Sequence, residues 1–270
     1  MPSEQFLSKV DNLPIRPSGP WIKDKYYYLS RYSKIFTMAM RRKWNLTFVD
    51  LFAGPGRCLI EATGKEVDGS ALQSLQYDFH KYIFVEQHPS CLAALKERSS
   101  KSPKAQNIKF FEGDCNALAG DIAQSMSSQD LHLIFADPTK INIHFKTIEQ
   151  LTCNKKADLL LNIQFGMDIK RNFARYKKEG DSSPMGLFLG GGVDWGAINE
   201  SLDVIKLYKK KIKDLGFSTV EYKDMEVRNT KNASMYFLFF ASRNSKGIEF
   251  WKKITSKHSS GQLEFLSMLP

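Results

Sequence analysis

Apolar positions along the chain alternate between a spacing typical of buried strands and one typical of helices. The runs TFVD, YIFVE, LIFA and DLLLNI are short and almost wholly apolar, as expected for strands that are covered on both faces. Longer segments lie between them, with apolar residues at every third or fourth position. Strands that alternate with helices in this way predict right-handed βαβ units, a parallel sheet and helices on both of its faces.

Further elements are expected at both ends of this alternation. The segment 25–43 has one apolar and one basic face, which predicts a helix, and another short helix is expected over 247–254. The runs STVEYKDM and SMYFLFFAS face each other across the polar EVRNTKNA, as an antiparallel pair would. We expect one domain over 1–270, with a helical extension at 1–44, a sheet core at 45–243 and a C-terminal helix and tail at 244–270.

The alternation is interrupted at two places. After the strand LTFVDLF, a glycine-rich turn and a mostly polar stretch delay the next helix, which we expect Asp68-Gly69-Ser70 to cap and which then runs through Leu75 to Phe79. The second interruption, at 164–196, is too long for an ordinary connection. Such insertions tend to be functional.

Charge and cysteine content limit the class of protein. The formal net charge of +10 and the pI near 9.3 favour an anionic partner, nucleic acid first and a membrane surface second. No apolar run approaches the length of a membrane helix, and the first residues do not resemble a signal peptide. The cysteines Cys58, Cys91, Cys115 and Cys153 stand far apart, so neither a disulfide framework nor a metal site is indicated, and a cytoplasmic location is expected.

The glycine turn DLFAGPGRCL narrows the choice of cofactor. A phosphate-binding P-loop would need G-x-x-x-x-G-K-[ST], but Glu66 follows Gly64-Lys65. A dinucleotide site would need a third glycine where Leu59 stands. S-adenosylmethionine has no phosphate to bind, and it needs close backbone approach, which Gly54 and Gly56 allow.

Four consecutive predicted strands end in an acidic residue. These are Asp50, Glu86, Asp114 and Asp137, and ligands of open α/β sheets bind beside the carboxyl ends of the strands. Asp50 is expected to attract the ammonium of S-adenosylmethionine, Glu86 to accept both ribose hydroxyls, and Asp114 to reach the adenine. The alternative interpretation is that these acids only cap the helices that follow.

Methyltransferases that act on amino groups of nucleic acids typically carry the motif Asp/Asn-Pro-Pro-aromatic at the fourth strand. Asp137-Pro138 stands at this place in the sequence, but Thr139-Lys140 replaces the second proline and the aromatic residue. The carboxylate of Asp137 and a backbone carbonyl are expected to hold an amino group, and Phe145 or Phe165 to replace the stacking ring. Asn162, at the end of the fifth strand, is a further candidate for the substrate site. In the insertion, Arg171, Arg175 and Lys178 are interleaved with Phe173 and Tyr176, a mixture that favours phosphates and unstacked bases, although an exposed basic helix is an equal alternative.

Nearly the whole chain resembles the three-Cys-motif partner protein family. The segments that carry the resemblance include KYYYLSRY, DLFAGPGRC, GKEVDGS, YIFVE, GDCN, ADPT, LYKKKIKDLGF and the terminal Phe250-Trp251. The family resembles class I methyltransferases, which implies a doubly wound Rossmann-like fold with seven strands in the order 3-2-1-4-5-7-6, the last of them antiparallel. The resemblance also implies a partner, a three-cysteine protein similar to the radical S-adenosylmethionine enzymes.

The sequence therefore predicts an S-adenosylmethionine-dependent methyltransferase whose acceptor is RNA or DNA. A cofactor-binding or catalytically silent partner subunit is the competing hypothesis, because the aromatic after Asp137-Pro138 is missing. Asp137 and Asn162 are the candidate catalytic residues, and Arg171, Arg175 and Lys178 the candidate substrate-binding residues. The expected cofactor site comprises Asp50, Phe52, Ala53, Gly54, Gly56, Glu86, Gln87, Asp114, Cys115 and Asp137.

Overall fold

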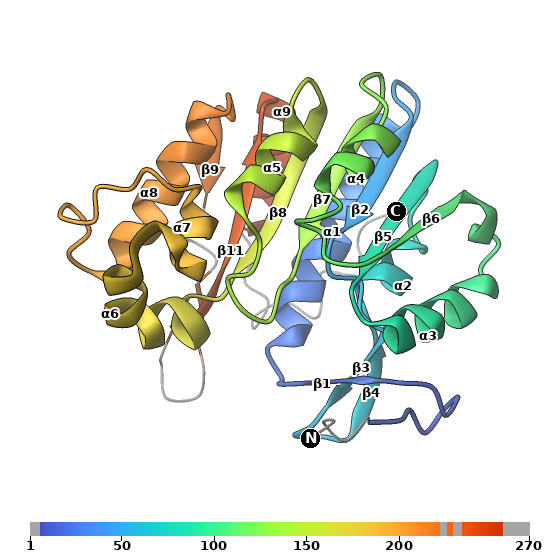
Figure 1. Cartoon of the computed structure of the whole chain (residues 1–270). Helices are drawn as coiled ribbons and strands as arrows, with labels where there is room; N and C mark the ends of the chain where they lie inside the picture. The colour runs from blue at the N-terminus through green and yellow to red at the C-terminus, as the bar shows by residue number, and fades with distance from the viewer. Residues whose placement is uncertain (1–5, 222–225, 229–233, 256–270) are drawn as a thin grey trace.

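A twisted, mostly parallel sheet forms the centre of the computed structural model, which describes residues 6–221, 226–228 and 234–255 (Figure 1). Its strands follow the order β6-β5-β2-β7-β8-β11, and both β9 and β10 pair with the outer edge of β11. Their bounds are β2 (Leu46–Asp50), β5 (Lys81–Glu86), β6 (Ile108–Glu112), β7 (Leu131–Ala136), β8 (Lys156–Ile163), β9 (Thr219–Glu221), β10 (Glu226–Arg228) and β11 (Ser234–Ser242).

This arrangement confirms the expected fold class, a Rossmann-like methyltransferase fold. The strands β6, β5, β2, β7 and β8 are parallel, and β11 is antiparallel to β8, with Phe239 opposite Leu161. The described chain differs from expectation at the last position of the order, where the two short strands β9 and β10 stand in place of a single sixth strand. β10 lies in the segment that the sequence pattern assigned to the connection, and the rest of that connection falls outside the described residues.

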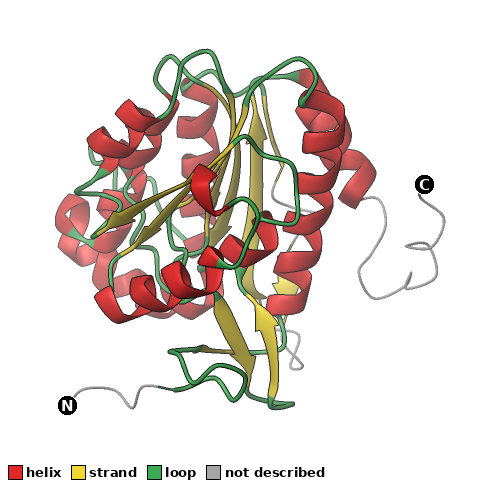
Figure 2. Ribbon diagram, turned by 90° about the vertical axis from the view of Figure 1, so that its right-hand side faces the viewer, coloured by secondary structure: helices red, strands yellow, loops and turns green. Residues whose placement is uncertain are grey.

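Helices cover both faces of the sheet (Figure 2). On one face lie α1 (Ile22–Met40), α2 (Ser70–Ser74), α3 (Pro89–Ser100) and α9 (Ser245–Thr255), and on the other α4 (Ala119–Ser125), α5 (Phe145–Thr152), α7 (Pro184–Leu189) and α8 (Ser201–Asp214). Successive side chains of β8 alternate between the two layers: Leu159 and Leu161 pack into one core cluster and Leu160 into the other. Burial on both faces explains why these strands are apolar at nearly every position.

Two helical regions depart from the expected pattern. The helix α2 ends at Ser74, so it does not run through Leu75 to Phe79. Phe79 instead packs its ring against Phe48, with centroids 5.3 Å apart. The insertion is helical: the π-helical turn η2 (Phe165–Ile169), α6 (Lys170–Glu179), the 3-10 turn η3 (Gly180–Ser182) and α7 follow one another, and another 3-10 turn, η1 (Ala105–Asn107), precedes β6.

A second, smaller sheet lies at the end of the main sheet where the parallel strands finish (Figure 1). The strands β3 (Arg57–Ile60) and β4 (Lys65–Asp68) form an antiparallel hairpin from the stretch that the sequence pattern treated only as a delay before the helix. The strand β1 (Arg16–Ser18) pairs with β3 in parallel, with Arg16 opposite Cys58. The N-terminal segment therefore crosses the edge of the main sheet at which ligands of such folds bind.

Arg98 of α3 holds this N-terminal segment in place. Its guanidinium donates two hydrogen bonds of 2.8 Å to the carboxylate of Asp11, one of 2.7 Å to the carbonyl of Pro14 and one of 2.6 Å to that of Pro55. The Arg98 side chain is only 4% exposed. A cation this deeply buried has to be paired, and its partners come from both the N-terminal segment and the glycine turn.

Within the described part of the chain, no helix is long and apolar enough to cross a lipid bilayer.

We expect the variant Arg98→Met to release the N-terminal segment while the main sheet stays folded. Removing one partner of a buried ion pair leaves Asp11 uncompensated, so the loss in free energy of unfolding should be roughly 3 kcal/mol. The Arg98 guanidinium holds the pKa of the Asp11 carboxyl below its usual value, so this stabilisation should be present at neutral pH and disappear in strong acid. Limited proteolysis and denaturant titration measure both effects, with the exposed Lys101→Met as the control. Equal protease resistance of both variants would contradict the assignment.

Candidate functional site

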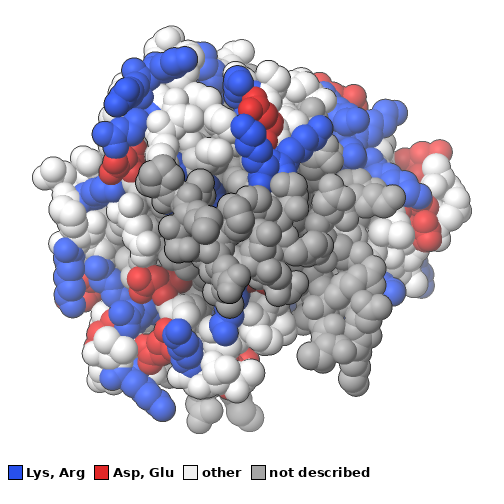
Figure 3. Space-filling model, turned by 180° about the vertical axis from the view of Figure 1, so that it is seen from behind, with Lys and Arg blue, Asp and Glu red and all other residues white. Residues whose placement is uncertain are grey.

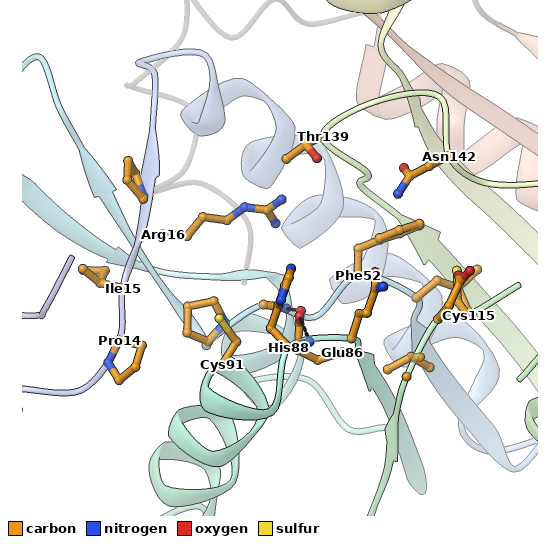
Figure 4. Close-up of a pocket in the computed structure, with 18 of the residues that line it drawn as sticks. Pro14, Ile15, Arg16, Phe52, Glu86, His88, Cys91, Cys115, Thr139 and Asn142 are labelled. Atoms are coloured by element: carbon orange, nitrogen blue, oxygen red, sulfur yellow. Dashed lines mark hydrogen bonds between the residues drawn. The ribbon is translucent and has the colours of Figure 1, made fainter. Parts of the chain in front are cut away.

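A cavity of about 350 Å³ opens at the carboxyl ends of β2, β5 and β6 (Figure 4). Phe52 and Gly54 of the glycine turn line it, together with Glu86 from the end of β5 and Asp114 from the end of β6. The N-terminal segment closes the other side with residues that include Pro14 and Arg16. All four acidic strand ends were expected at one cofactor site. Two of them, Glu86 and Asp114, line this cavity, whereas Asp50 and Asp137 do not.

Glu86 is the most firmly held polar side chain of this cavity. One carboxylate oxygen accepts the backbone N–H of Gly54 at 2.8 Å, and the other accepts the backbone N–H of His88, also at 2.8 Å. The residue is 8% exposed. Each oxygen still has a lone pair for a further donor, so the carboxylate suits two neighbouring hydroxyl groups of a ligand. Gln87, also predicted for this site, lines the cavity beside it.

Glycine is required at the two positions of the turn for different structural reasons. Gly56 has φ of 86°, and its carbonyl accepts the N–H of Gly69 at 2.7 Å, which closes the base of the β3–β4 hairpin. A Cβ there would lie 3.0 Å from Leu95, so packing also requires glycine. Gly54 has φ of 62° and faces the cavity, where a Cβ would meet, among the described residues, only Nη1 of Arg16 within 4 Å. Gly54 is therefore the glycine that allows a ligand to approach the backbone.

Asp50 lies behind the cavity wall and does not line it. It is fully buried, and its Oδ1 accepts the N–H of Phe52 at 3.2 Å, while Oδ2 lies near the side chain of Ser70 without a well-formed hydrogen bond to any described residue. Burial raises the pKa of Asp50 to about 7. Ala53, another predicted contact, is buried and donates its N–H to the carbonyl of Val85, so it fixes the turn against β5.

Asp114 and Cys115 form the far end of the cavity. Asp114 is exposed, and its Oδ1 accepts both the backbone N–H and the side-chain amide of Asn116, at 2.9 and 3.0 Å. The same Asn116 amide donates to the carbonyl of Asn142, which is another residue of the lining. Burial raises the pKa of the Cys115 thiol to about 12, so it lines the cavity as a neutral, weakly polar group.

A second cavity of about 300 Å³ adjoins the first, and Arg16, Pro17 and Thr139 line both. Its walls come mainly from β1, the start of α1 and the end of β7. Asp137 lines this second cavity and not the first. Two neighbouring spaces at one sheet edge suit a reaction between two bound molecules.

Asp137 is already paired. Its Oδ2 lies 2.5 Å from Nζ of Lys25, and its Oδ1 accepts a hydrogen bond of 2.6 Å from the amide of Asn162. The side chains of Lys25 and Asp137 are only 8% and 12% exposed. Burial opposes the ionisation of Asp137, but the Lys25 ammonium outweighs it and holds the pKa of the carboxyl below its usual value. The carbonyl of Pro138 is also occupied, by the amide of Gln164 at 2.8 Å.

The sequence pattern did not identify Lys25 or Arg16 as site residues. One signal for Lys25 was present: it precedes Tyr28, Leu29 and Tyr32 by three, four and seven positions, so it falls on the apolar face of α1. A cation on a buried helix face needs a partner, and that partner is Asp137. Arg16 gave no comparable signal, because it reaches the cavities only through the pairing of β1 with β3 (Figure 4).

Neither ring proposed to replace the missing aromatic reaches a cavity. Phe165 packs against Phe237 with centroids 4.9 Å apart, and Phe145 packs against Tyr208 at 5.9 Å. The rings that line the second cavity are those of Trp21, Tyr26 and Tyr236. Asn162 is buried in β8 and lines neither cavity, so it reaches the site through its hydrogen bond to Asp137.

The three cations predicted to bind substrate lie on α6, which directly follows the turn η2. Arg171 and Lys178 are exposed, and Nε of Arg175 lies 3.8 Å from Oε1 of Glu179. The interleaved aromatics face inward: Tyr176 is buried and donates to Asp168 at 2.7 Å, and Phe173 packs against the core. On the face seen in Figure 3, basic side chains are spread among acidic ones, outside the atoms drawn in grey. Among the described residues, no group of three or more His, Cys, Asp and Glu side chains is arranged to hold a metal ion.

No protein-family model matches this chain, and no curated protein does. Membership of the three-Cys-motif partner family therefore stays a prediction. Protein LPL1258 from Legionella pneumophila is similar in structure, with 11% identity and a TM-score of 0.52 over 88% of this chain and 92% of that one.

Two solved methyltransferases show weaker likenesses. TomG, an O-methyltransferase from Streptomyces achromogenes solved with S-adenosylmethionine, has 12% identity and a TM-score of 0.46, covering 87% of this chain and 83% of its own. The precorrin-6y C5,15-methyltransferase from Geobacter metallireducens has 14% identity and a TM-score of 0.45, covering 82% and 88%. At these identities the likenesses concern the fold, so activity has to be argued from the residues of this chain.

We expect Asp50→Asn to stabilise the protein at alkaline pH. The raised pKa means that the folded state binds a proton more tightly than the unfolded state, so wild-type stability falls as pH rises from about 4 through 7. The amide needs no ionisation, and the variant should be more stable at pH 8 by roughly 1–3 kcal/mol, a gain that shrinks toward pH 4. Denaturant titrations across this range measure it. Because Asp50 lies behind the wall, ligand affinity should change less than threefold; a larger loss would return Asp50 to the cofactor site.

Proposed function

We propose that this protein is a methyltransferase that uses S-adenosylmethionine and acts on a nucleic acid. The observation that carries the proposal is the carboxylate of Glu86, which two backbone N–H groups hold at the edge of a cavity with acceptor capacity left over. A ribose presents two adjacent hydroxyl donors, which such a carboxylate matches. When bound, the cofactor supplies an electrophilic methyl group on a positively charged sulfur.

The other residues of the first cavity suit the remaining parts of this cofactor. The ring of Phe52 and the neutral thiol of Cys115 offer apolar surface for an adenine, and Asp114 at the rim can accept from its amino group. The Arg16 guanidinium reaches into the cavity beside Gly54 and suits the carboxylate of the amino-acid part. The second cavity lies next to Arg16, so an acceptor bound there would be a neighbour of the methyl group.

Charge supports a nucleic acid as the acceptor. The net charge is +10, and Arg171 and Lys178 are exposed on α6. The helix begins one residue after η2, whose Met167 lines the second cavity and is 37% exposed. A polyanion bound along α6 would thus be able to place one group at the mouth of that cavity.

The competing hypothesis, a silent subunit that binds a three-cysteine partner, makes the opposite prediction for transfer. Incubation with S-adenosylmethionine labelled in the methyl group, with cell extract separated into RNA, DNA, protein and small molecules, decides between the two. If the protein is the proposed methyltransferase, the label appears in the RNA or DNA fraction. A silent subunit leaves every fraction unlabelled, whether or not a partner protein is added.

Replacing Glu86 tests the cofactor site directly. Losing hydrogen bonds to a charged acceptor costs about 1.5–3 kcal/mol, so Glu86→Ala should weaken S-adenosylmethionine binding at least tenfold. Glu86→Gln keeps one acceptor oxygen, so its affinity for S-adenosylmethionine should lie between those of the wild type and of Glu86→Ala. Glu112→Ala is the matched control, because Glu112 is the register partner of Glu86 on β6 but is exposed and lines neither cavity. Calorimetry provides the affinities, and an unchanged affinity for Glu86→Ala would refute the cofactor site.

Salt dependence tests the nucleic-acid acceptor. If α6 contacts phosphates, the double variant Arg171→Ala, Lys178→Ala should lower the slope of log affinity against log salt by roughly 2. The matched control is Lys210→Ala, Lys213→Ala, which removes the same charge from exposed positions of α8. Fluorescence anisotropy with labelled single-stranded RNA at several salt concentrations measures both slopes. Equal slopes for the two double variants would argue against α6 as the contact surface.

A further inference from the structure

The hydrogen-bond acceptors of the second cavity are largely in use. Both carboxylate oxygens of Asp137 are engaged, by Lys25 and by Asn162, and the carbonyl of Pro138 accepts the amide of Gln164. These are the groups that would have to hold an amino group of an acceptor. Glu61 is the other carboxylate in the lining, and it is exposed. An amino nitrogen entering the cavity would therefore have to share an oxygen that already accepts from Lys25, Asn162 or Gln164.

The hydrogen-bond donors of the same cavity, in contrast, still have unused N–H groups. The Lys25 ammonium carries three N–H groups and gives one to Asp137, while its nitrogen lies 5.7 Å from the ring centre of Tyr236. Arg16, which lines both cavities, makes no hydrogen bond or ion pair with any residue that the structure describes. Two cations with unused N–H groups thus face a cavity whose buried carboxylate, Asp137, already accepts at both oxygens.

Aromatic rings make up much of the remaining wall. The hydroxyl of Tyr236 donates to the carbonyl of Trp21 at 2.9 Å, and the hydroxyl of Tyr26 contacts the sulfur of Cys58 at 3.5 Å. Their hydroxyl groups already have partners, so these side chains offer the cavity mainly apolar ring surface. Such walls suit a planar group.

We propose that the atom methylated is an ionised oxygen on a planar group, bound by Lys25 and by the Arg16 N–H groups that the cofactor carboxylate does not use, and not an amino nitrogen held by Asp137. This inference rests on the proposed function and specifies its acceptor. A lone pair of the oxygen forms the new carbon–oxygen bond, and the electron pair of the breaking carbon–sulfur bond passes to sulfur. The negative charge of the oxygen and the positive charge of the sulfur both disappear, and no proton has to leave.

The assignment changes the role of Asp137. An ionised nucleophile needs no general base, and the carboxylate instead holds the Lys25 ammonium at the cavity wall. Asp137 is then a positioning residue, and Asn162 fixes its second oxygen. In a nucleic acid the group that fits this description is the oxygen of an ionised base. A phenolate, an aromatic carboxylate and an aryl phosphate present a similar negatively charged oxygen beside a planar ring to Lys and Arg donors, so they can stand in for it.

Two probes of the same shape test the assignment without knowledge of the acceptor. Binding of 4-nitrophenolate and of 4-nitroaniline is measured by absorbance titration with S-adenosylhomocysteine present, at a pH where the nitrophenol is ionised. We expect the phenolate to bind at least tenfold more tightly than the aniline. Benzoate and phenyl phosphate, used as competitors, then show whether a carboxylate or a phosphate oxygen is preferred.

Variants of Lys25 connect this preference to the cavity. Lys25→Met should reduce the preference for the phenolate to threefold or less, and Lys25→Arg should keep most of it. Because Lys25→Met leaves Asp137 buried without a partner, the double variant Lys25→Met, Asp137→Asn removes both charges and should show the same loss. Lys23→Met is the control: Lys23 is exposed on the same helix, lies outside the lining of this cavity, and its replacement should leave the preference unchanged.

Every outcome of the probe titrations bears on the inference. Aniline binding as tightly as the phenolate, no binding of either probe, or a preference that survives the loss of Lys25 overturns it. Failure of the proposed function looks different: no S-adenosylmethionine binding and no transfer of labelled methyl. A protein that binds the cofactor through Glu86 but prefers the aniline, or labels a nitrogen, keeps the function and refutes only the oxygen.

Discussion

The charge of Asp137 has to be neutralised inside the protein, and the arrangement of the site follows from that constraint. An ionised carboxylate with so little contact with water is stable only beside an opposite charge, which Lys25 supplies at 2.5 Å. Because Lys25 lies in the first turn of α1, this helix has to begin at the carboxyl edge of the sheet. The preceding strand β1 is thereby brought across the same edge, where Arg16 reaches both cavities.

Much of the fold could be predicted because burial on both faces leaves a clear record in the sequence. The central strands β2, β5, β7 and β8 are buried along most of their length and mainly apolar, whereas the edge strand β6 is half-buried to exposed. The βαβ rule predicts their parallel direction, and the resemblance to methyltransferases implies their order. The β3–β4 hairpin was missed because it covers no core on two sides: Arg57, Cys58, Leu59 and Ile60 alternate between half-buried and buried positions. A polar, half-buried hairpin next to glycines has the composition of a loop.

The four acidic strand ends show which part of a site sequence alone predicts. Their common edge follows from parallel strands, but the direction of each carboxylate depends on the backbone of the turn that follows. Glu86 faces the first cavity because the N–H groups of Gly54 and His88 hold it there, whereas Asp50 turns back toward Phe52 and is sealed in. Asp137 turns toward α1 and the second cavity. Nothing in the spacing of these residues distinguishes the three orientations.

The division of the site into two cavities also separates the parts of the chain that serve them. The glycine turn and the strand ends form one side of the first cavity, and the N-terminal segment closes the other side. The second takes half of its lining from the segment 16–26, which comprises β1 and the start of α1, and takes Gln164 and Met167 from the insertion. An acceptor would therefore be selected mainly by the N-terminal segment, while α6 offers charge outside the cavity. Arg98, which ties that segment to the glycine turn, then couples the shape of the acceptor cavity to that of the first.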